Sequence, residues 1–242
     1  MSRERADVLL VARGLAESRA RARALILDGK VAGVTKPGQL LDAGAALQLA
    51  EPDHPWVGRG GLKLAAALDH FRIDPAGLTG LDVGASTGGF TDVLLARGAV
   101  RVYAVDVGHG QLHPRLAADP RVVSLEGVNA RDLDAELVPE RPGIVVSDVS
   151  FISLKAALPR ALERAAPGAA LVALVKPQFE AGRERVGKGG VVRDETVRQA
   201  VRDETVRWLE AEMGWRVGGV TDSPVAGSDG NREYLLAAFA PE

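Results

Sequence analysis

Seven apolar runs follow one another from residue 80 onward, separated by loops or by stretches with helical patterning. Strands that alternate with helices predict a parallel sheet with helices on both faces, because parallel neighbours need crossover connections. We therefore expect an α/β fold with a Rossmann-like, seven-stranded sheet. The predicted strands comprise residues 80–83, 101–107, 122–125, 144–149, 170–175, 217–221 and 234–239.

The first 50 residues have another pattern and predict a small, separate α+β domain. Residues 5–12 and 19–27 are expected to be helical, with Ser18 as the N-cap of the second helix. Short extended pieces are expected at residues 30–34 and 46–49. A polar segment with two prolines follows, so the expected boundaries are 1–50 for this domain, 51–58 for a linker and 59–242 for the large domain.

The charge is distributed unevenly along the chain. Residues 1–36 carry eight lysines and arginines against four acids, so this segment has a charge of +4 while the whole chain has −2. A basic head on an acidic body is typical of a polyanion-binding module joined to a module with another task. The alternative is a solvated helix face, which charge alone favours.

The composition excludes several classes of protein. The chain has no cysteine, which excludes disulfides, thiolate metal sites and a cysteine nucleophile, and which fits a reducing cytoplasm. No apolar run reaches the roughly 18 residues of a membrane span. Charged residues interrupt the only apolar patch near the N-terminus, which argues against a secretory signal. We expect a cytoplasmic protein without a metal site.

The strongest local signal is LDVGASTGGF at residues 81–90, where an apolar strand runs into a glycine-rich turn and a helix. The dinucleotide fingerprint G-x-G-x-x-G would need a glycine at position 86, where the chain has Ser86. Gly84, Gly88 and Gly89 instead fit the G-x-x-x-G-G turn of enzymes that use S-adenosylmethionine. The alternative is an ordinary tight turn between a strand and a helix.

Two polar residues follow the next two strands. Asp106 ends the second predicted strand, where a carboxylate can accept hydrogen bonds from ribose hydroxyls. Asn129 lies just past the third strand, where it could bond an adenine or simply cap the next helical turn. After the glycine-rich turn, Asp106 favours a cofactor that contains a nucleoside.

Charged residues close two further strands. Asp148 follows the run IVVS, and Lys176 follows the run LVALV. A lysine at the end of a buried strand is costly unless it is paired or functional. In a doubly wound sheet both residues should lie on the ligand-binding edge. Glu233 begins the last predicted strand.

With these residues, the large domain resembles the ribose 2'-O-methyltransferases of the FtsJ type, which carry a Lys-Asp-Lys-Glu tetrad. The matching residues are Lys63 in RGGLK, Asp148 in SDVSFIS, Lys176 in VKPQFE and Glu233 in NREY. From residue 5 to residue 239 the chain is similar to the narrower TlyA family, also called hemolysin A. In that family a ribosomal-protein-type RNA-binding domain precedes the methyltransferase, and the segment RADVLLVARGLAESRARARALILDGKV resembles it throughout.

The resemblance implies a monomer that transfers a methyl group from S-adenosylmethionine to a ribose 2'-hydroxyl, of a cytidine, in ribosomal RNA or a ribosomal subunit. It implies that the tetrad is catalytic. The implied cofactor-binding residues are Gly84, Ala85, Ser86, Gly88, Gly89, Phe90, Asp106 and Asn129. The implied RNA-binding residues are Arg5, Ser18, Arg19, Arg23, Lys30 and Arg59.

In the implied mechanism Lys176 takes the proton of the ribose hydroxyl, while Lys63 and Glu233 orient the ribose. Lys176 can do this only as a neutral amine. Burial, the positive sulfur of the cofactor and Lys63 favour the neutral form, whereas Asp148 and Glu233 oppose it. The sequence leaves open which effect is larger.

Other classes of protein would share parts of this pattern. A NAD-dependent dehydrogenase would need the glycine that is missing at position 86. A small-molecule methyltransferase would not need residues 1–50, and a non-enzymatic ribosome-associated RNA-binding factor would not need a lysine after a buried strand. The name hemolysin suggests a membrane-active protein, but no membrane-length or strongly amphipathic segment supports that class.

Overall fold

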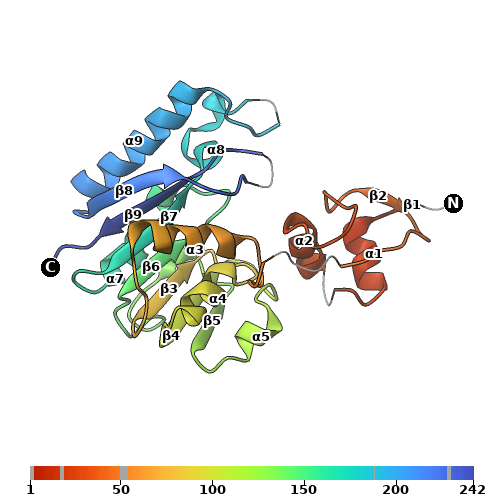
Figure 1. Ribbon diagram of the computed structural model, residues 1–242, viewed down its shortest axis with the longest axis horizontal. Helices are drawn as coiled ribbons and strands as arrows, with labels where there is room; N and C mark the ends of the chain where they lie inside the picture. Colours follow the sequence, from red (N-terminus) through yellow and green to blue (C-terminus); the bar gives the residue numbers. More distant parts are fainter. Residues whose placement is uncertain (1–2, 17–18, 50–53, 188, 228–229) are drawn as a thin grey trace.

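The structure is a computed structural model that describes residues 3–16, 19–49, 54–187, 189–227 and 230–242. Figure 1 shows a small head, residues 3–49, at one end of a larger body. Helix α2 (Arg19–Leu27) is the part of the head that faces the body. The C-terminus lies at the opposite end of the molecule.

A seven-stranded sheet forms the centre of the body, as predicted. In chain order the strands are β3 (Thr79–Val83), β4 (Arg101–Asp106), β5 (Val122–Glu126), β6 (Ile144–Ser147), β7 (Ala170–Val175), β8 (Arg216–Asp222) and β9 (Tyr234–Phe239). Their order across the sheet is β5-β4-β3-β6-β7-β9-β8. The chain runs outward from β3 to β5 and then crosses back to β6, so the strand order reverses between β3 and β6, where such sheets bind ligands.

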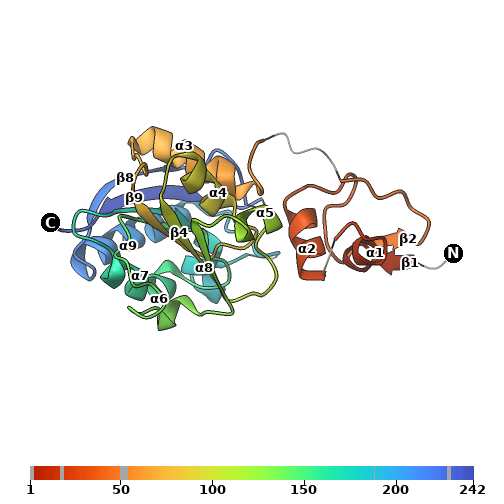
Figure 2. The ribbon, with the colours of Figure 1, turned by 90° about the horizontal axis from the view of Figure 1, so that it is seen from below.

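Helices cover both faces of the sheet, which confirms the predicted layers. Figure 2 shows α3 and α4 on one face and α6, α7 and α9 on the other. The helices are α3 (Gly60–Phe71), α4 (Gly89–Ala96), α5 (Pro114–Ala117), α6 (Leu154–Ala157), α7 (Pro159–Arg164), α8 (Pro177–Glu180) and α9 (Glu195–Ala211), with short 3-10 turns η1 (Ala130–Asp132) and η2 (Arg183–Arg185). Each face buries its own apolar cluster, because side chains alternate along a strand: Leu171 and Ala173 join one cluster, and Val172 and Leu174 the other.

The expectation that the whole sheet is parallel is wrong for the last strand. Strands β3 to β7 pair in parallel, but β9 is antiparallel to both β7 and β8. The described chain between β8 and β9 contains no crossover helix, so β9 returns in the opposite direction. The first residue of β9, Tyr234, therefore pairs with Val175 at the end of β7, and Glu233 reaches the edge at which the parallel strands end.

The head contains β1 (Arg3–Arg5), α1 (Ala6–Ala12), α2 and β2 (Leu40–Asp42). Both predicted helices are confirmed, although the first begins one residue later because Arg5 pairs with Leu40 in an antiparallel sheet that was not predicted. The extended pieces expected at residues 30–34 and 46–49 are wrong as strands: among the described residues they form only an isolated bridge, between Val31 and Leu49. Gly33, with a φ of +72°, turns the chain there. The predicted N-cap Ser18 lies outside the described residues.

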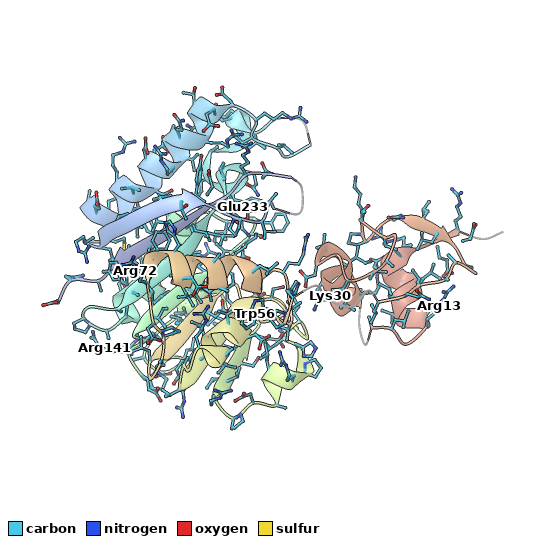
Figure 3. All side chains as sticks on the ribbon, viewed as in Figure 1. Arg13, Lys30, Trp56, Arg72, Arg141 and Glu233 are labelled. Atoms are coloured by element: carbon cyan, nitrogen blue, oxygen red, sulfur yellow. The ribbon has the colours of Figure 1, made fainter. Side chains whose placement is uncertain are left out.

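Two hydrogen bonds tie the head to the start of the body. Lys30 Nζ donates to the carbonyl oxygen of Val57 at 2.6 Å, and Arg59 Nη2 donates to the carbonyl oxygen of Leu27 at 2.5 Å. Figure 3 shows Lys30 on the side of the head near the body and Arg13 farther from it. The C-terminal end of α2 therefore packs against the segment that leads into α3.

Candidate active site

The ends of four strands supply the candidate site at one edge of the sheet. β3 runs into Gly84, β4 ends with Asp106, β6 runs into Asp148 and β7 runs into Lys176. Most side chains of these strands are apolar and buried, so most of the polar groups stand where the strands leave the core. The antiparallel β9 adds Glu233 at the same edge.

Lys176 is buried directly after β7, and acceptors surround its ammonium group. Nζ lies 2.5 Å from Asp148 Oδ1, 2.9 Å from Ser150 Oγ and 3.3 Å from the carbonyl oxygen of Asp148. This paired and hydrogen-bonded setting offsets much of the cost of removing an ammonium group from water. The loop after β6 thus holds the lysine in one place.

A second buried ion pair belongs to the same site. Lys63, on α3, donates from Nζ to Glu233 Oε2 at 2.6 Å, and the two side chains are 10% and 3% exposed. The two residues are 170 positions apart in the sequence. Only the packing of α3 against β7 and β9 brings them together.

All four charged residues predicted for catalysis line one cavity of about 240 Å³. Phe151 lines this cavity although the residue as a whole is 92% exposed, and its φ of +68° is strained for a residue with a Cβ atom. Its ring centroid lies 5.2 Å from that of Phe179. The sequence analysis did not single out Ser150 or Phe151, and only their place in SDVSFIS could have indicated them.

The glycine-rich turn after β3 forms the second part of the site. Gly84 has a φ of +85°, and a Cβ atom there would lie within 3.0–3.2 Å of Val149, so glycine lets the loop after β6 approach. Ser86 stands where the dinucleotide fingerprint has glycine, yet it also adopts a left-handed φ, of +49°. Asp106 supports this turn by accepting a hydrogen bond from the Ser86 amide at 2.8 Å.

The remaining residues of this turn divide into two groups. Ala85, Gly89 and Phe90 line a cavity of about 160 Å³ together with Gly84 and Ser86. Gly88 lines neither this cavity nor the one that contains the four charged residues. A Cβ atom on Gly88 would overlap the side chain of Leu116, so its small size serves the packing of α5.

A third cavity, of about 380 Å³, continues from this turn along the ends of β4 and β5. Its walls are mostly apolar, and Asp106 and Asn129 both line it. The two oxygens of Asp106 accept hydrogen bonds from the amides of Ser86 and Gly108, at 2.8 and 2.7 Å. Asn129 Oδ1 accepts from the Arg131 amide at 3.1 Å, so the capping role considered for Asn129 is confirmed.

Two carboxylates that were not predicted from the sequence, the buried Asp82 and the half-buried Glu180, hold the helices next to the site. Asp82, in β3, accepts hydrogen bonds from Thr91 N and Oγ1 at 2.9 and 2.7 Å, yet burial raises its pKa to about 7. Glu180 accepts from the Leu154 amide at 2.7 Å, and burial also raises its pKa to about 7. These carboxylates fix the first turns of α4 and α6, the helices that follow the loops of the site.

The predicted RNA-binding residues are not equivalent. Arg5 and Arg19 both pair with the buried Asp7, at 2.9 and 3.2 Å, and the hydrogen bond from Arg5 lowers the pKa of that carboxyl. Arg23 is exposed and forms no ion pair with any residue that the structure describes. Lys30 and Arg59 bond across the head–body junction. RNA binding by these residues stays a prediction.

A Rossmann-like sheet whose glycine-rich turn, strand-end carboxylate and two lysine–carboxylate pairs share one edge defines a protein of the methyltransferase class. The model of the FtsJ-like methyltransferase family matches residues 56–239. The chain is 48% identical over 239 residues to the 16S/23S rRNA (cytidine-2'-O)-methyltransferase TlyA of Mycobacterium tuberculosis, which covers 97% of this chain and 89% of that protein. The chain therefore belongs to the TlyA family of FtsJ-like methyltransferases.

Two further relatives agree with this assignment. The chain is 39% identical over 236 residues to Hemolysin A of Brachyspira hyodysenteriae, with 96% of this chain and 98% of that protein covered. The solved structure of a protein described as a hemolysin from Streptococcus thermophilus superposes with a TM-score of 0.77 at 42% identity, covering 100% of this chain and 90% of that one. Among the described residues no helix combines the length and apolarity needed to cross a membrane, and no group of three or more His, Cys, Asp or Glu could hold a metal ion.

Proposed function

We propose that this chain transfers the methyl group of S-adenosylmethionine to the ribose 2'-hydroxyl of a cytidine in ribosomal RNA. The observation that carries the proposal is the convergence of Lys63, Asp148, Lys176 and Glu233 on one open cavity. That cavity shares Ser86 and Asp148 with the two cavities at the glycine-rich turn. A methyl donor and an acceptor ribose in adjoining cavities would meet beside Asp148.

The residues present fit this cofactor. The apolar cavity along β4 and β5 suits adenine; Asp106 would accept hydrogen bonds from ribose hydroxyls there, and the amide nitrogen of Asn129 would donate to the base. The smaller cavity around Gly84 and Ser86 suits the methionine end. When bound, S-adenosylmethionine supplies an electrophilic methyl group on a positively charged sulfur.

Lys176 would take up the proton that the ribose 2'-hydroxyl loses when its oxygen is methylated. This role requires a neutral amine, and Asp148 and Ser150 hold the nitrogen in position at 2.5 and 2.9 Å. The Lys63–Glu233 pair orients the ribose through its remaining donors and acceptors. These steps need no metal ion from the protein.

The acceptor is assigned from the relatives and from the head. TlyA of Mycobacterium tuberculosis is named for the cytidine 2'-oxygen of ribosomal RNA, and its similarity extends over the head as well as the body. We assign residues 1–50 to an RNA-binding domain, 51–58 to a linker and 59–242 to the methyltransferase domain, acting as a monomer in the cytoplasm. In this assignment the exposed Arg23 contacts RNA phosphates.

Mapping of ribose methylation across ribosomal RNA tests the proposal. We expect a cytidine 2'-O-methyl group that disappears in cells without this chain, returns with the wild-type chain and does not return with Lys176→Ala. Lys155→Ala, at an exposed lysine of α6 outside the cavities, is the matched control and should restore the mark. The same methylation pattern with and without the chain would contradict the proposal.

A further inference from the structure

The end of helix α2, in the head, forms part of the wall of the catalytic cavity. Ala24, Leu27 and Asp28 line the cavity that contains the four charged residues. Asp28 also lines the smaller cavity around the glycine-rich turn, and Leu27 also lines the cavity along β4 and β5. Residues of the head therefore line all three cavities of the site.

Close contacts with the body define the place of Asp28. Arg59 Nη2 donates to the carbonyl oxygen of Leu27 at 2.5 Å, immediately before Asp28. A Cβ atom on Gly58 would lie 3.3 Å from Asp28 Oδ2 and 2.7 Å from Thr87 Oγ1. A glycine at position 58 thus allows the carboxylate of the head to come close to the glycine-rich turn of the body.

The smaller cavity offers a carboxylate of the head to a cationic group. Among the described residues that line it, the charged ones are Asp28, Asp148 and Lys176. Asp148 and Lys176 pair with each other at 2.5 Å, and the carboxylate of Asp28 lines the same cavity from the side of the head. Helix α2 ends at Leu27, and the partial negative charge at the C-terminus of a helix adds to that of the carboxylate.

We infer that Asp28 binds the α-ammonium group of the methionine moiety of S-adenosylmethionine, so that the cofactor joins the head to the body. The inference rests on the proposed function, because it takes this cofactor as the ligand. An ammonium group can donate a charge-assisted hydrogen bond to a carboxylate, whereas a sulfonium has no hydrogen to donate. Cofactor binding would then hold the head, and any RNA on it, over a loaded active site.

Calorimetry with three ligands tests this contact in the full chain. S-Adenosylmethionine and S-adenosylhomocysteine both carry the ammonium group, and 5'-methylthioadenosine lacks it. Asp28→Asn keeps an acceptor oxygen but removes its charge, so it should weaken binding of the first two by about tenfold, because charge-assisted hydrogen bonds are roughly twice as strong as neutral ones, and should leave the third unchanged. Asp28→Glu, which keeps the charge, should recover part of the affinity. Asp42→Asn, at an exposed acid of the head, is the control and should change none of the three affinities.

Hydrogen exchange provides a second measurement. Saturating S-adenosylhomocysteine should slow exchange of the α2 amides in the wild-type chain and should do so much less in Asp28→Asn. Unchanged affinity for S-adenosylmethionine in Asp28→Asn would overturn the inference and leave the proposed function intact. A wild-type chain that does not bind S-adenosylmethionine would overturn the proposed function itself. If Asp28→Asn lowered the affinity for S-adenosylmethionine alone, or lowered the affinities for all three ligands equally, the ammonium contact would also be overturned.

Discussion

The head and the body each contain a fully buried aspartate, Asp7 and Asp82, and they hold it in opposite ways. In the head, the fully buried Asp7 is paired with Arg5 and Arg19, and the hydrogen bond from Arg5 lowers its pKa. In the body, the fully buried Asp82 takes its hydrogen bonds from Thr91, and burial raises its pKa to about 7. Ion pairing stabilises the charged form in the head, whereas the body keeps a carboxylate that is difficult to ionise.

The size of the two cores explains the difference. Among the described residues, the head buries one cluster of eight apolar residues, while the body buries clusters of 24 and 20. A small core leaves little margin of stability, so a buried charge there needs partners. The larger core of the body can tolerate groups that lower its stability, such as the desolvated Asp82 and the buried ion pairs of Lys63 and Lys176.

If the buried charged residues of the body are catalytic, Lys176→Ala should have the largest effect on the rate of methyl transfer. We expect the rate of methyl transfer at saturating cofactor to fall by about 10² to 10⁴, the usual range for losing a general base, with the fold retained. Lys176→Arg should be nearly as impaired, because a guanidinium cannot be deprotonated at working pH. Single-turnover rates at saturating cofactor measure both variants. A wild-type rate in the alanine variant would refute the catalytic role, and substantial activity in the arginine variant would make Lys176 a positioning group.

The second effect is the contribution of the Lys63–Glu233 pair to the free energy of unfolding of the protein. Lys63→Met leaves Glu233 buried without its partner and should lower the free energy of unfolding by about 3–5 kcal/mol. The double variant Lys63→Met/Glu233→Leu should recover most of that loss but not the activity. The control in the head is Arg3→Ala, since Arg3 and Asp42 are exposed and 4.0 Å apart, and it should cost less than about 1 kcal/mol. Urea denaturation measures all three, and equal costs at the two pairs would contradict the comparison.

The third effect is the pH dependence of stability. Asp82 has a native pKa of about 7, above the unfolded value near 3.9, so the native state binds more protons between these values. Its contribution therefore falls as pH rises from about 4 to 7, and Asp82→Asn should remove on the order of 2 kcal/mol of this dependence. Asp7 has the opposite sign: its lowered native pKa contributes stability that is lost as pH falls below about 4. The free energy of unfolding of both proteins is measured from pH 5 to pH 8. If it changed with pH in the same way in Asp82→Asn and in the wild type, the assignment would be contradicted.

The smallest effect separates the arginines of the head. Arg23→Ala should reduce the dependence of log K on log salt by about 0.7 to 0.9 for RNA binding, because one phosphate contact is lost, without changing stability. Arg19→Ala should also destabilise the head, because it removes one partner of the buried Asp7. Binding titrations over a series of salt concentrations test this difference. An unchanged slope in Arg23→Ala would show that α2 presents only a solvated basic face.

Local signals in the sequence predicted much of the fold. Apolar runs identified the seven strands within a few residues, and the glycine-rich turn marked the point where the first of them meets a helix. Asp148 and Lys176 were placed correctly at the binding edge, because a residue that directly follows a parallel strand must lie at the carboxyl end of the sheet. The short strands of the head were missed, because three residues are too few for a periodic pattern.

The sequence by itself therefore determined which residue follows each strand, since apolar runs, glycines and strand-end charges are read within a few positions of the chain. The tertiary structure alone decided which of these residues meet. The antiparallel direction of β9 carries Glu233 to Lys63 across 170 positions, Arg19 of α2 is joined to Asp7 of α1, and α2 brings Asp28 to the cavity at the glycine-rich turn. Such contacts depend on packing between elements distant in the chain, and the free energy of that packing is a sum over the whole core that no short segment contains.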